Sequence, residues 1–163
     1  MVSIVLIGYR GVGKSTIGKR LASSFDLPFV DSDEAILHFA GSPSVQSIWD
    51  EGGEAAWRAL EEEVVLKLLQ NDGVLALGGG APGVTAIRAS LMGRANVLYL
   101  TAPLEVLQER LEGGERPALS SGDAQILQER HPIYLECSSS QIDASGTIEE
   151  TLNAAKAAVE ELS

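Results

Sequence analysis

The chain has 163 residues, of which 45% are hydrophobic and 21% charged, a balance that predicts one soluble globular domain over residues 1–163 rather than a disordered chain. Twelve Lys and Arg residues against 23 Asp and Glu residues give a net charge of -11, which repels polyanions and disfavours nucleic acid as a partner. No apolar run approaches the roughly 18 residues that cross a bilayer, so we expect neither a membrane span nor a membrane partner.

Apolar runs of strand length alternate along the chain with longer stretches of helical periodicity, which is a βα pattern. In chain order, the expected elements are a strand at residues 3–7, a helix at 14–25, a strand at 28–30, a helical region that reaches residue 69, a strand at 74–77, a helix near 84–91, a strand at 96–100, a helix at 103–111, a strand at 141–143 and a helix at 148–162. Parallel strands need crossover helices on both faces, so the pattern predicts a three-layer α/β/α sandwich around a five-stranded parallel sheet. Ligands of such folds bind at the carboxyl ends of the strands.

Two stretches interrupt this alternation. Residues 40–53 contain several glycines and a proline, which break the second helical region into short pieces. Residues 112–123 are rich in Gly, Ser and charge and are expected as a mobile surface loop between two helices.

Farther along, Cys137 is the one cysteine and cannot form an internal disulfide, which agrees with a cytoplasmic location. A small buried side chain is the favoured interpretation of Cys137, with a reactive thiol as the alternative.

A glycine-rich loop follows the first strand and precedes the first helix. Residues 8–15, Gly-Tyr-Arg-Gly-Val-Gly-Lys-Ser, match the phosphate-binding pattern G-x-x-x-x-G-K-[ST] in the required context, which disfavours a chance turn. Backbone N–H groups and the positive end of the helix would hold the β-phosphate, Lys14 would contact the β- and γ-phosphates, and Ser15 would ligate Mg²⁺. The loop therefore predicts binding of a nucleoside triphosphate with one Mg²⁺, through Gly11, Val12, Gly13, Lys14, Ser15 and Thr16.

Two acidic residues, Asp31 and Asp33, follow the second strand. Both are expected to leave its carboxyl end beside the phosphate loop and, with a period of two, to point the same way. Asp31 could hold the water shell of the magnesium ion, while Asp33 could orient or deprotonate an acceptor hydroxyl. The alternative is an Asp N-cap for the helix that starts near Glu34.

Arg58 and the glycines that end the third strand each have two interpretations. Arg58 and Glu61 lie three residues apart on one helix face, and spacing alone favours a surface ion pair of little energetic value. Gly78, Gly79 and Gly80 lack Cβ atoms, so their backbone could approach a ligand closely and donate N–H groups. A loose turn in the left-handed conformation is an equally good interpretation of the three glycines from local sequence.

Five of the eight arginines fall in loops or helices that could face one cleft: Arg10, Arg58, Arg110, Arg116 and Arg130. Phosphoryl transfer needs cations that neutralise charge on the moving group as water leaves, and a loop arginine could supply one. A solubility role would explain any single arginine, but their clustering on an acidic protein is informative. His38, His131, Trp49 and Trp57 show no metal-like or base-like spacing, so packing or surface roles are expected for them.

Taken together, these residues resemble the shikimate kinases, relatives of the nucleoside monophosphate kinases with a P-loop NTPase fold. The resemblance covers nearly the whole chain and rests on the phosphate loop, the pair Asp31 and Asp33, residues 48–61 (similar to I-F-x-x-x-G-E-x-x-F-R-x-x-E), residues 78–80, the pair Arg116 and Pro117, and residues 129–136 (similar to R-x-P-L-Y-x-E). It implies the sheet order 2-3-1-4-5 and transfer of the γ-phosphoryl group of ATP to the 3-hydroxyl of shikimate, in aromatic amino-acid synthesis. The expected partners are ATP and shikimate, and the chain is expected as a monomer.

The resemblance also implies roles for individual residues. Asp33, Arg58, Gly79, Gly80 and Arg130 would bind shikimate, with the two arginines on its carboxylate and Asp33 on its hydroxyls. Lys14 and Arg116 would contact the transferring phosphate, and Arg110 with residues 144–146 would lie at the adenine. Residues 33–61 would then form the acceptor-binding subregion and residues 112–123 a lid.

Some positions depart from the family pattern. Trp49 and Trp57 stand where phenylalanines are usual, and Ala118 stands at a usual leucine of the lid. The stretch from Arg116 to Arg130 is shorter than in many members, and the residues after Asp143 lack the arginines that some members have there. Another small-molecule kinase, such as a gluconate kinase, and a catalytically silent nucleotide-binding regulator remain the alternatives.

Overall fold

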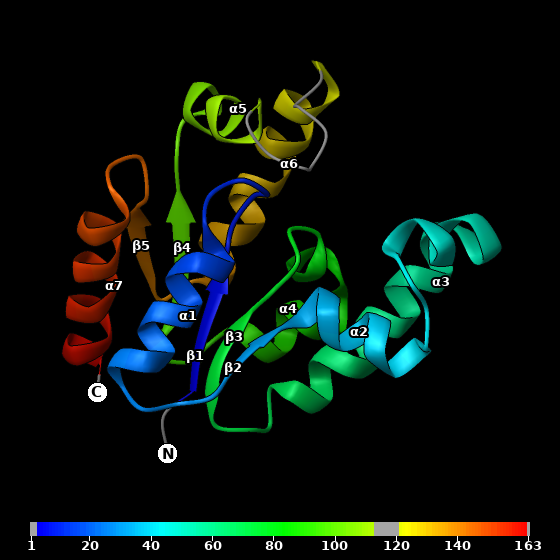
Figure 1. Cartoon of the computed structure of the whole chain (residues 1–163), viewed down its shortest axis with the longest axis horizontal. Coiled ribbons are helices and arrows are strands. Elements are labelled where there is room, and N and C mark those ends of the chain that lie inside the picture. Colours follow the sequence, from blue (N-terminus) through cyan, green and yellow to red (C-terminus); the bar gives the residue numbers. More distant parts are fainter. Residues whose placement is uncertain (1–2, 113–120, 163) are drawn as a thin grey trace.

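The computed structural model describes residues 3–112 and 121–162, and Figure 1 shows them as a central sheet with helices on both sides. The strands are β1 (Ser3–Ile7), β2 (Phe29–Asp31), β3 (Gly73–Ala76), β4 (Val97–Thr101) and β5 (Ser140–Asp143). The helices are α1 (Lys14–Ser24), α2 (Ser32–Ala40), α3 (Val45–Leu68), α4 (Thr85–Leu91), α5 (Leu104–Glu112), α6 (Ser121–Cys137) and α7 (Ile148–Leu162), with a short 3-10 turn, η1, at Ala81–Gly83. The expected alternation of strands and helices is confirmed.

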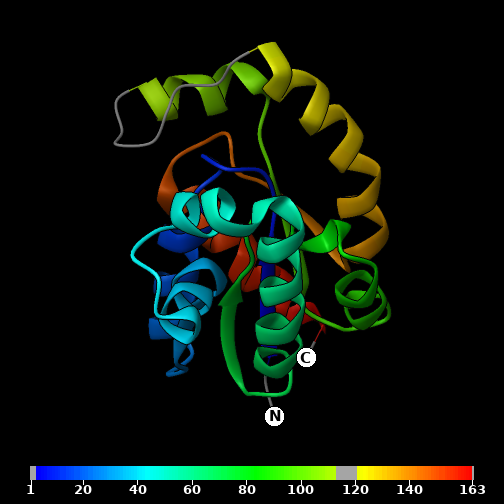
Figure 2. The ribbon, with the colours of Figure 1, turned by 90° about the vertical axis from the view of Figure 1, so that its right-hand side faces the viewer.

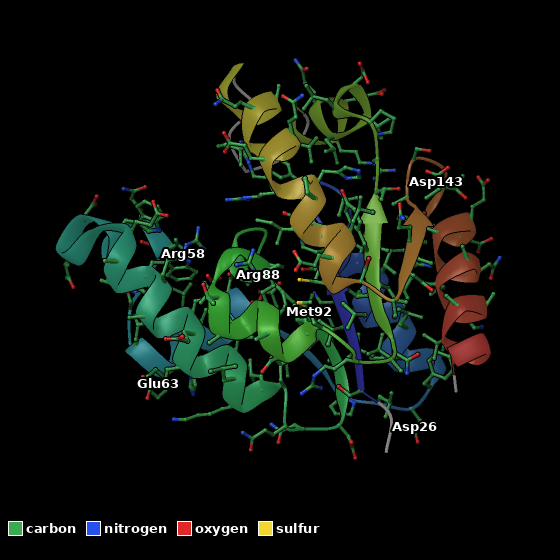
Figure 3. All side chains as sticks on the ribbon, turned by 180° about the vertical axis from the view of Figure 1, so that it is seen from behind. Asp26, Arg58, Glu63, Arg88, Met92 and Asp143 are labelled. Carbon is green, nitrogen blue, oxygen red and sulfur yellow. The ribbon has the colours of Figure 1, made fainter. Side chains whose placement is uncertain are left out.

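All five strands run parallel in the order β2-β3-β1-β4-β5, which confirms the order that the family resemblance implies. Helices α1 and α7 cover one face of the sheet (Figure 1), while α3, α4 and α6 lie on the opposite face (Figure 3). The three-layer sandwich predicted from the βα pattern is therefore correct. Figure 3 also labels Asp143, which ends β5 at the edge of the sheet where the strands have their carboxyl ends.

The core divides into two layers because successive strand residues point to opposite faces of the sheet. In β1, Ile4 and Leu6 are buried against α1 and α7, and Val5 and Ile7 are buried against α3, α4 and α6. Strands that are buried on both faces must be apolar throughout, which is why β1, β3 and β4 read as continuous hydrophobic runs. Cys137 belongs to the second layer and is 2% exposed, as expected for a small buried side chain.

The second helical region is broken where its glycines predict a break. Gly41, with a φ of 65° in the left-handed region, caps the C-terminus of α2, and α3 bends at Gly53, where φ is 72°. Trp57 follows the bend and packs in a third small core of α2 and α3, where it is 4% exposed. Figure 2 looks onto the side of the molecule where α2 and α3 pack together, and Figure 1 shows both helices beyond the edge of the sheet that β2 forms.

The expected loop at residues 112–123 needs a correction at both ends. Glu112 is the last residue of α5, and residues 121–123 form the first turn of α6, because the helical structure extends further than the loop-like composition predicted. The rest of that loop, including Arg116, lies outside the described residues. Among the helices that the structure describes, none combines the length and apolar character of a membrane span.

Candidate active site

The phosphate loop leaves β1 at its carboxyl end and enters α1 directly. Gly8, Gly11 and Gly13 have φ angles of 148°, 87° and 102°, which side chains with a Cβ rarely adopt. Lys14 folds back over the loop, and its Nζ donates hydrogen bonds to the carbonyl oxygens of Gly8, at 2.5 Å, and Tyr9, at 3.2 Å. The backbone of this segment therefore curls around one point beside the N-terminus of α1, which is the geometry of an anion cradle.

Asp31 accepts hydrogen bonds at both of its carboxylate oxygens. Its Oδ1 accepts hydrogen bonds from the N–H groups of Asp33, at 2.9 Å, and Glu34, at 3.2 Å, so it caps α2. Its Oδ2 accepts a hydrogen bond of 2.7 Å from the Ser15 hydroxyl. The N-cap alternative is therefore correct and does not exclude a site role, because the second carboxylate oxygen faces the phosphate loop. Asp31 ends β2 and Asp33 lies in the first turn of α2, which corrects the expectation that both follow the strand.

The three glycines after β3 are explained by close approach of side chains. None of them has a positive φ, so the left-handed turn considered as an alternative is wrong. A Cβ at Gly78 would lie 2.5 Å from Asp33 Oδ1, and one at Gly79 would lie 3.1 Å from Arg130 Nη1. A Cβ at Gly80 would lie 2.5 Å from Arg58 Nη1. The glycine triplet thus makes room for Asp33, Arg130 and Arg58, which come from three different helices.

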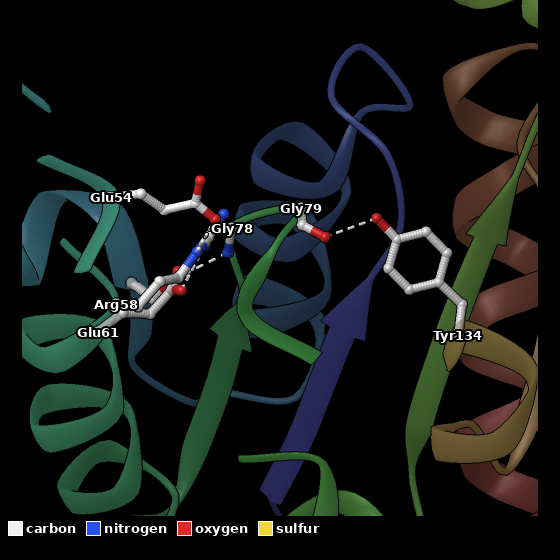
Figure 4. A network of polar contacts seen from close by, with 7 residues as sticks. Glu54, Arg58, Glu61, Gly78, Gly79 and Tyr134 are labelled. Atoms are coloured by element: carbon white, nitrogen blue, oxygen red, sulfur yellow. Dashed lines mark hydrogen bonds and ion pairs between the residues drawn. The ribbon is translucent and has the colours of Figure 1, made fainter. Parts of the chain in front are cut away.

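Arg58 is held by a buried carboxylate rather than by a surface one. Its Nη1 donates a hydrogen bond of 2.7 Å to Glu61 Oε1, and its Nε lies 3.8 Å from Glu54 (Figure 4). Glu61 is 1% exposed, so the surface ion pair that spacing favoured is wrong. Burial raises the pKa of Glu61 above its ordinary value, and the hydrogen bond and charge of Arg58 oppose that rise. The pair fixes the guanidinium beside Gly80.

Two tyrosines contact Arg130 and the glycine triplet. The Arg130 guanidinium lies over the ring of Tyr9, with its carbon 5.6 Å from the ring centroid. The Tyr134 hydroxyl donates a hydrogen bond of 2.6 Å to the carbonyl oxygen of Gly79, as Figure 4 shows. Tyr134 is 1% exposed, and burial raises its pKa well above the ordinary value, so this donor stays protonated. The Gly79 backbone is thereby tied to α6.

Most of the expected site residues border one cavity of about 400 Å³ at the carboxyl ends of the strands. It is lined by Arg10, Gly11, Gly13, Lys14, Ser15, Thr16, Asp31, Asp33, Ala76, Leu77, Gly78, Gly79, Arg110, Leu111 and Arg130. Arg58 and Gly80 contact each other next to Gly79, at the border of this lining. The fold therefore brings the phosphate loop, the acidic pair and the residues expected to bind the acceptor into one place.

Arg110 connects this cavity with a second one. Its guanidinium donates hydrogen bonds to the carbonyl oxygens of Val12, at 3.1 Å, Ala144 and Gly146, at 3.3 Å. A cavity of about 450 Å³ lies beside it, lined by Gly11, Val12, Gly13, Thr16, Ile17, Arg110, Ala144, Gly146, Thr147, Ile148 and Thr151. The second cavity thus runs from the phosphate loop to the segment between β5 and α7, where the resemblance expects the adenine.

Sequence reasoning missed several residues that shape the site. The Ser32 hydroxyl accepts a hydrogen bond of 3.0 Å from Gly78 N–H and is fully buried. Tyr9 and Asp123 make a hydrogen bond of 2.5 Å across 114 positions of sequence. The position of Ser32 between Asp31 and Asp33 was a signal for the first contact, but no local pattern could predict the second.

Comparison with known proteins shows the family to which the chain belongs. The sequence model of the shikimate kinase family matches residues 10–161. A shikimate kinase from Rhodococcus jostii is 36% identical over 87% of this chain and 88% of its own length. A bifunctional shikimate kinase/3-dehydroquinate synthase from Thermotoga maritima is 40% identical over 82% of this chain, which spans 27% of that longer protein.

Solved structures give the same result. The shikimate kinase of Aquifex aeolicus matches 98% of this chain and 96% of its own, with a TM-score of 0.86 and 30% identity. The Acinetobacter baumannii enzyme in complex with shikimate matches 99% of this chain and 92% of its own, with a TM-score of 0.83 and 28% identity. A gluconokinase from Sinorhizobium meliloti, at 21% identity and a TM-score of 0.63, shares the fold. The chain belongs to the shikimate kinase family.

Proposed function

We propose that the chain transfers the γ-phosphoryl group of ATP to the 3-hydroxyl of shikimate, giving shikimate 3-phosphate and ADP. The observation that carries this proposal is the glycine triplet, which admits one carboxylate and two guanidinium groups at the edge of a phosphate-binding cavity. An acceptor with a carboxylate and several hydroxyls matches that set of groups. The Acinetobacter baumannii relative that was solved with shikimate supports the choice of acceptor.

On the acceptor side, Arg58 and Arg130 would bind the carboxylate of shikimate. Guanidinium groups suit this task because they donate parallel hydrogen bonds to both carboxylate oxygens. Asp33 would accept a hydrogen bond from the reacting hydroxyl, and the backbone of Gly79 and Gly80 would contact the ring. These groups come from residues 33–61, from the glycine triplet and from α6, and we propose residues 33–61 as the acceptor-binding subregion.

On the nucleotide side, residues 11–16 would hold the phosphates, with Lys14 between the β- and γ-phosphates. The Ser15 hydroxyl and Asp31 carboxylate lie 2.7 Å apart, and such oxygen ligands suit Mg²⁺. A bound Mg²⁺ would supply charge neutralisation at the phosphates. Arg110 borders the second cavity and is proposed to contact the nucleotide there. Arg116, which lies outside the described residues, is proposed to contact the transferring group from a lid between α5 and α6.

The reaction itself needs little covalent work from the protein. The 3-hydroxyl oxygen forms a bond to the γ-phosphorus, the bond between that phosphorus and the bridging oxygen of ADP breaks, and the hydroxyl proton passes to Asp33. Lys14 would stabilise the charge that develops on the phosphoryl oxygens. Because positioning and electrostatics supply most of the rate, fixed side chains such as Arg58 matter as much as the proton acceptor.

A single assay tests the function and its alternatives. ADP release from ATP with Mg²⁺ is measured with shikimate, gluconate and AMP as parallel acceptors. Stimulation by shikimate alone is expected, stimulation by gluconate or AMP instead would favour another small-molecule kinase, and stimulation by none would favour a silent nucleotide-binding regulator. In the same assay, Asp33→Asn should lower turnover at least about 100-fold while ATP binding is retained, because general-base catalysis contributes factors of this order. Normal turnover of the variant would remove Asp33 as the proton acceptor.

The setting of the enzyme is also a proposal. We propose that it acts as a cytoplasmic monomer, because the proposed nucleotide and acceptor residues would form a complete site without a second copy, and its single cysteine suits a reducing compartment. Size-exclusion chromatography with light scattering would test this state, and a dimer mass would contradict it.

A further inference from the structure

A buried carboxylate on α6 reaches the phosphate loop. Asp123 lies in the first turn of α6, and its side chain is 10% exposed. The Tyr9 hydroxyl donates a hydrogen bond of 2.5 Å to Asp123 Oδ1, and Arg10 Nη2 lies 3.2 Å from Asp123 Oδ2. Tyr9 and Arg10 are consecutive residues of the phosphate loop, so one carboxylate holds two neighbouring loop side chains.

Tyr9 extends this contact to the acceptor side of the site. Tyr9 is 3% exposed, and its ring lies against the guanidinium of Arg130, which borders the same cavity as Arg10. Burial, followed by the hydrogen bond and charge of Asp123, raises the pKa of Tyr9 to about 12, so the hydroxyl remains a donor at neutral pH. Asp123 therefore contacts Arg10 directly and is connected to Arg130 through Tyr9.

A purely structural role for Asp123 must be weighed against this arrangement. A carboxylate in the first turn of a helix stabilises the helix by interacting with its dipole, and an exposed side chain is sufficient for that effect. Asp123 instead is buried and spends both oxygens on side chains of the phosphate loop. Burying a carboxylate is costly unless it is paired and hydrogen-bonded, and the contacts with Tyr9 and Arg10 contribute that compensation here.

We propose that Asp123 is a positioning residue for phosphoryl transfer, which fixes Arg10 beside the phosphate loop and, through Tyr9, fixes Arg130 at the acceptor carboxylate. The inference rests on the proposed function and extends it, since Tyr9 and Asp123 have no part in the chemistry described above. It predicts that loss of Asp123 affects the binding of both ATP and shikimate, although Asp123 itself need not contact either substrate.

The test uses Asp123→Asn, Tyr9→Phe and the double variant, with Glu129→Gln as the matched control. Glu129 is an exposed carboxylate on the same helix, and its described hydrogen bond goes to Gln125. Asp123→Asn keeps the shape and loses the charge, so kcat/KM should fall about tenfold for both ATP and shikimate, the effect of one charged hydrogen bond. Tyr9→Phe keeps the ring and the Arg10 pair, so about a threefold rise is expected in the KM for shikimate alone.

The double variant tests whether Asp123 acts through Tyr9. If Asp123 acts through Tyr9, adding Tyr9→Phe to Asp123→Asn should cost little more for shikimate, because the shared hydrogen bond is already weakened. Additive losses, or kcat/KM of Asp123→Asn within about twofold of the parent and of Glu129→Gln, would overturn the proposal. Thermal melting of each variant accompanies the assays. If Asp123→Asn does not fold, Tyr9→Phe decides the question, and an unchanged KM for shikimate would overturn the proposal.

The parent protein distinguishes this inference from the proposed function. A parent that releases no ADP with shikimate refutes the proposed function, whereas an active parent with indifferent variants refutes only the role of Asp123. Equilibrium dissociation constants for ADP and shikimate, measured on the same proteins, do not depend on turnover. Weaker binding of both ligands by Asp123→Asn supports the positioning role, and unchanged binding of both contradicts it.

Discussion

Gly80→Ala tests directly whether the glycine triplet exists to admit side chains. Gly80 has a φ of -92° and a ψ of -8°, a conformation that alanine adopts without strain. The effect of the new methyl group must therefore come from what it meets, which is Arg58: its Nη1 would be 2.5 Å away and its Cζ 2.7 Å away. Carbon and nitrogen atoms settle near 3.5 Å or more, so the guanidinium has to move by about 1 Å.

The size of the effect follows from what holds Arg58. A movement of about 1 Å stretches the 2.7 Å bond to Glu61 beyond hydrogen-bond range and displaces the guanidinium from its proposed position at the acceptor carboxylate. A hydrogen bond to a charged group contributes about 1.5–3 kcal/mol, and each 1.4 kcal/mol corresponds to a factor of ten, so kcat/KM for shikimate should fall about 10- to 100-fold. The KM for ATP should stay the same, because Arg58 does not line the nucleotide cavities.

The assay is ADP release at saturating ATP with shikimate titrated, and the control is Gly83→Ala. A Cβ at Gly83 meets no atom within 4 Å and its φ is not positive, so this variant should behave like the parent. An arginine is flexible at its far end, and the melting temperature of Gly80→Ala should therefore drop by only a few degrees. An unchanged KM for shikimate in folded Gly80→Ala, or an equal loss in Gly83→Ala, would refute the argument from close approach.

Three further outcomes follow from the contacts of the site. Asp31→Asn should raise the Mg²⁺ concentration needed for half-maximal activity about tenfold with little change in melting temperature, because asparagine still caps α2; an unaltered Mg²⁺ titration would contradict a metal role. Arg110→Met should raise the KM for ATP about tenfold, since it removes the hydrogen bonds to Val12 and Gly146, while the KM for shikimate should not change. Equal changes in both KM values would argue against a nucleotide role of Arg110. Because the pKa of Glu61 is raised above its ordinary value of 4.5, the folded protein holds this proton more tightly than the unfolded chain does. The free energy of unfolding should therefore decrease as pH rises from 4.5 through the raised pKa. Urea unfolding of Glu61→Gln over the same pH range should lack this decrease.

The sequence predicted the fold well because its signals are local. Buried parallel strands must be apolar on both faces, and the helices between them show a different period, so the alternation could be read along the chain. Element ends were less accurate: β2 runs to Asp31 rather than Val30, which moves Asp33 onto α2. The strand order is not written in any local pattern and came from the family resemblance alone.

The sequence indicates those residues of the candidate site that belong to recognisable motifs. Pattern and position predict functions for the phosphate loop and Asp31, which stay predictions. The reason for Gly80 could not be predicted, because it depends on an arginine that approaches from a helix. The burial of Glu61 likewise depends on how α3 packs, which spacing on one helix does not determine. The contact between Tyr9 and Asp123 spans 114 positions, so only the folded chain brings its partners together.

The acidic character of the chain fits a site that binds anions, because the acids fix the cations in place. Arg58 is paired with Glu61 and Arg10 with Asp123, while Lys14 and Arg110 donate to backbone carbonyls. These partners reduce the local positive potential, which weakens the capture of an anion at a distance. They also hold the donors in position before the substrate arrives, so little reorganisation is needed as charge moves in the transition state. Since phosphoryl transfer depends mainly on positioned charge, we expect the second effect to outweigh the first, so that the carboxylates around the cavity support the proposed catalytic arrangement.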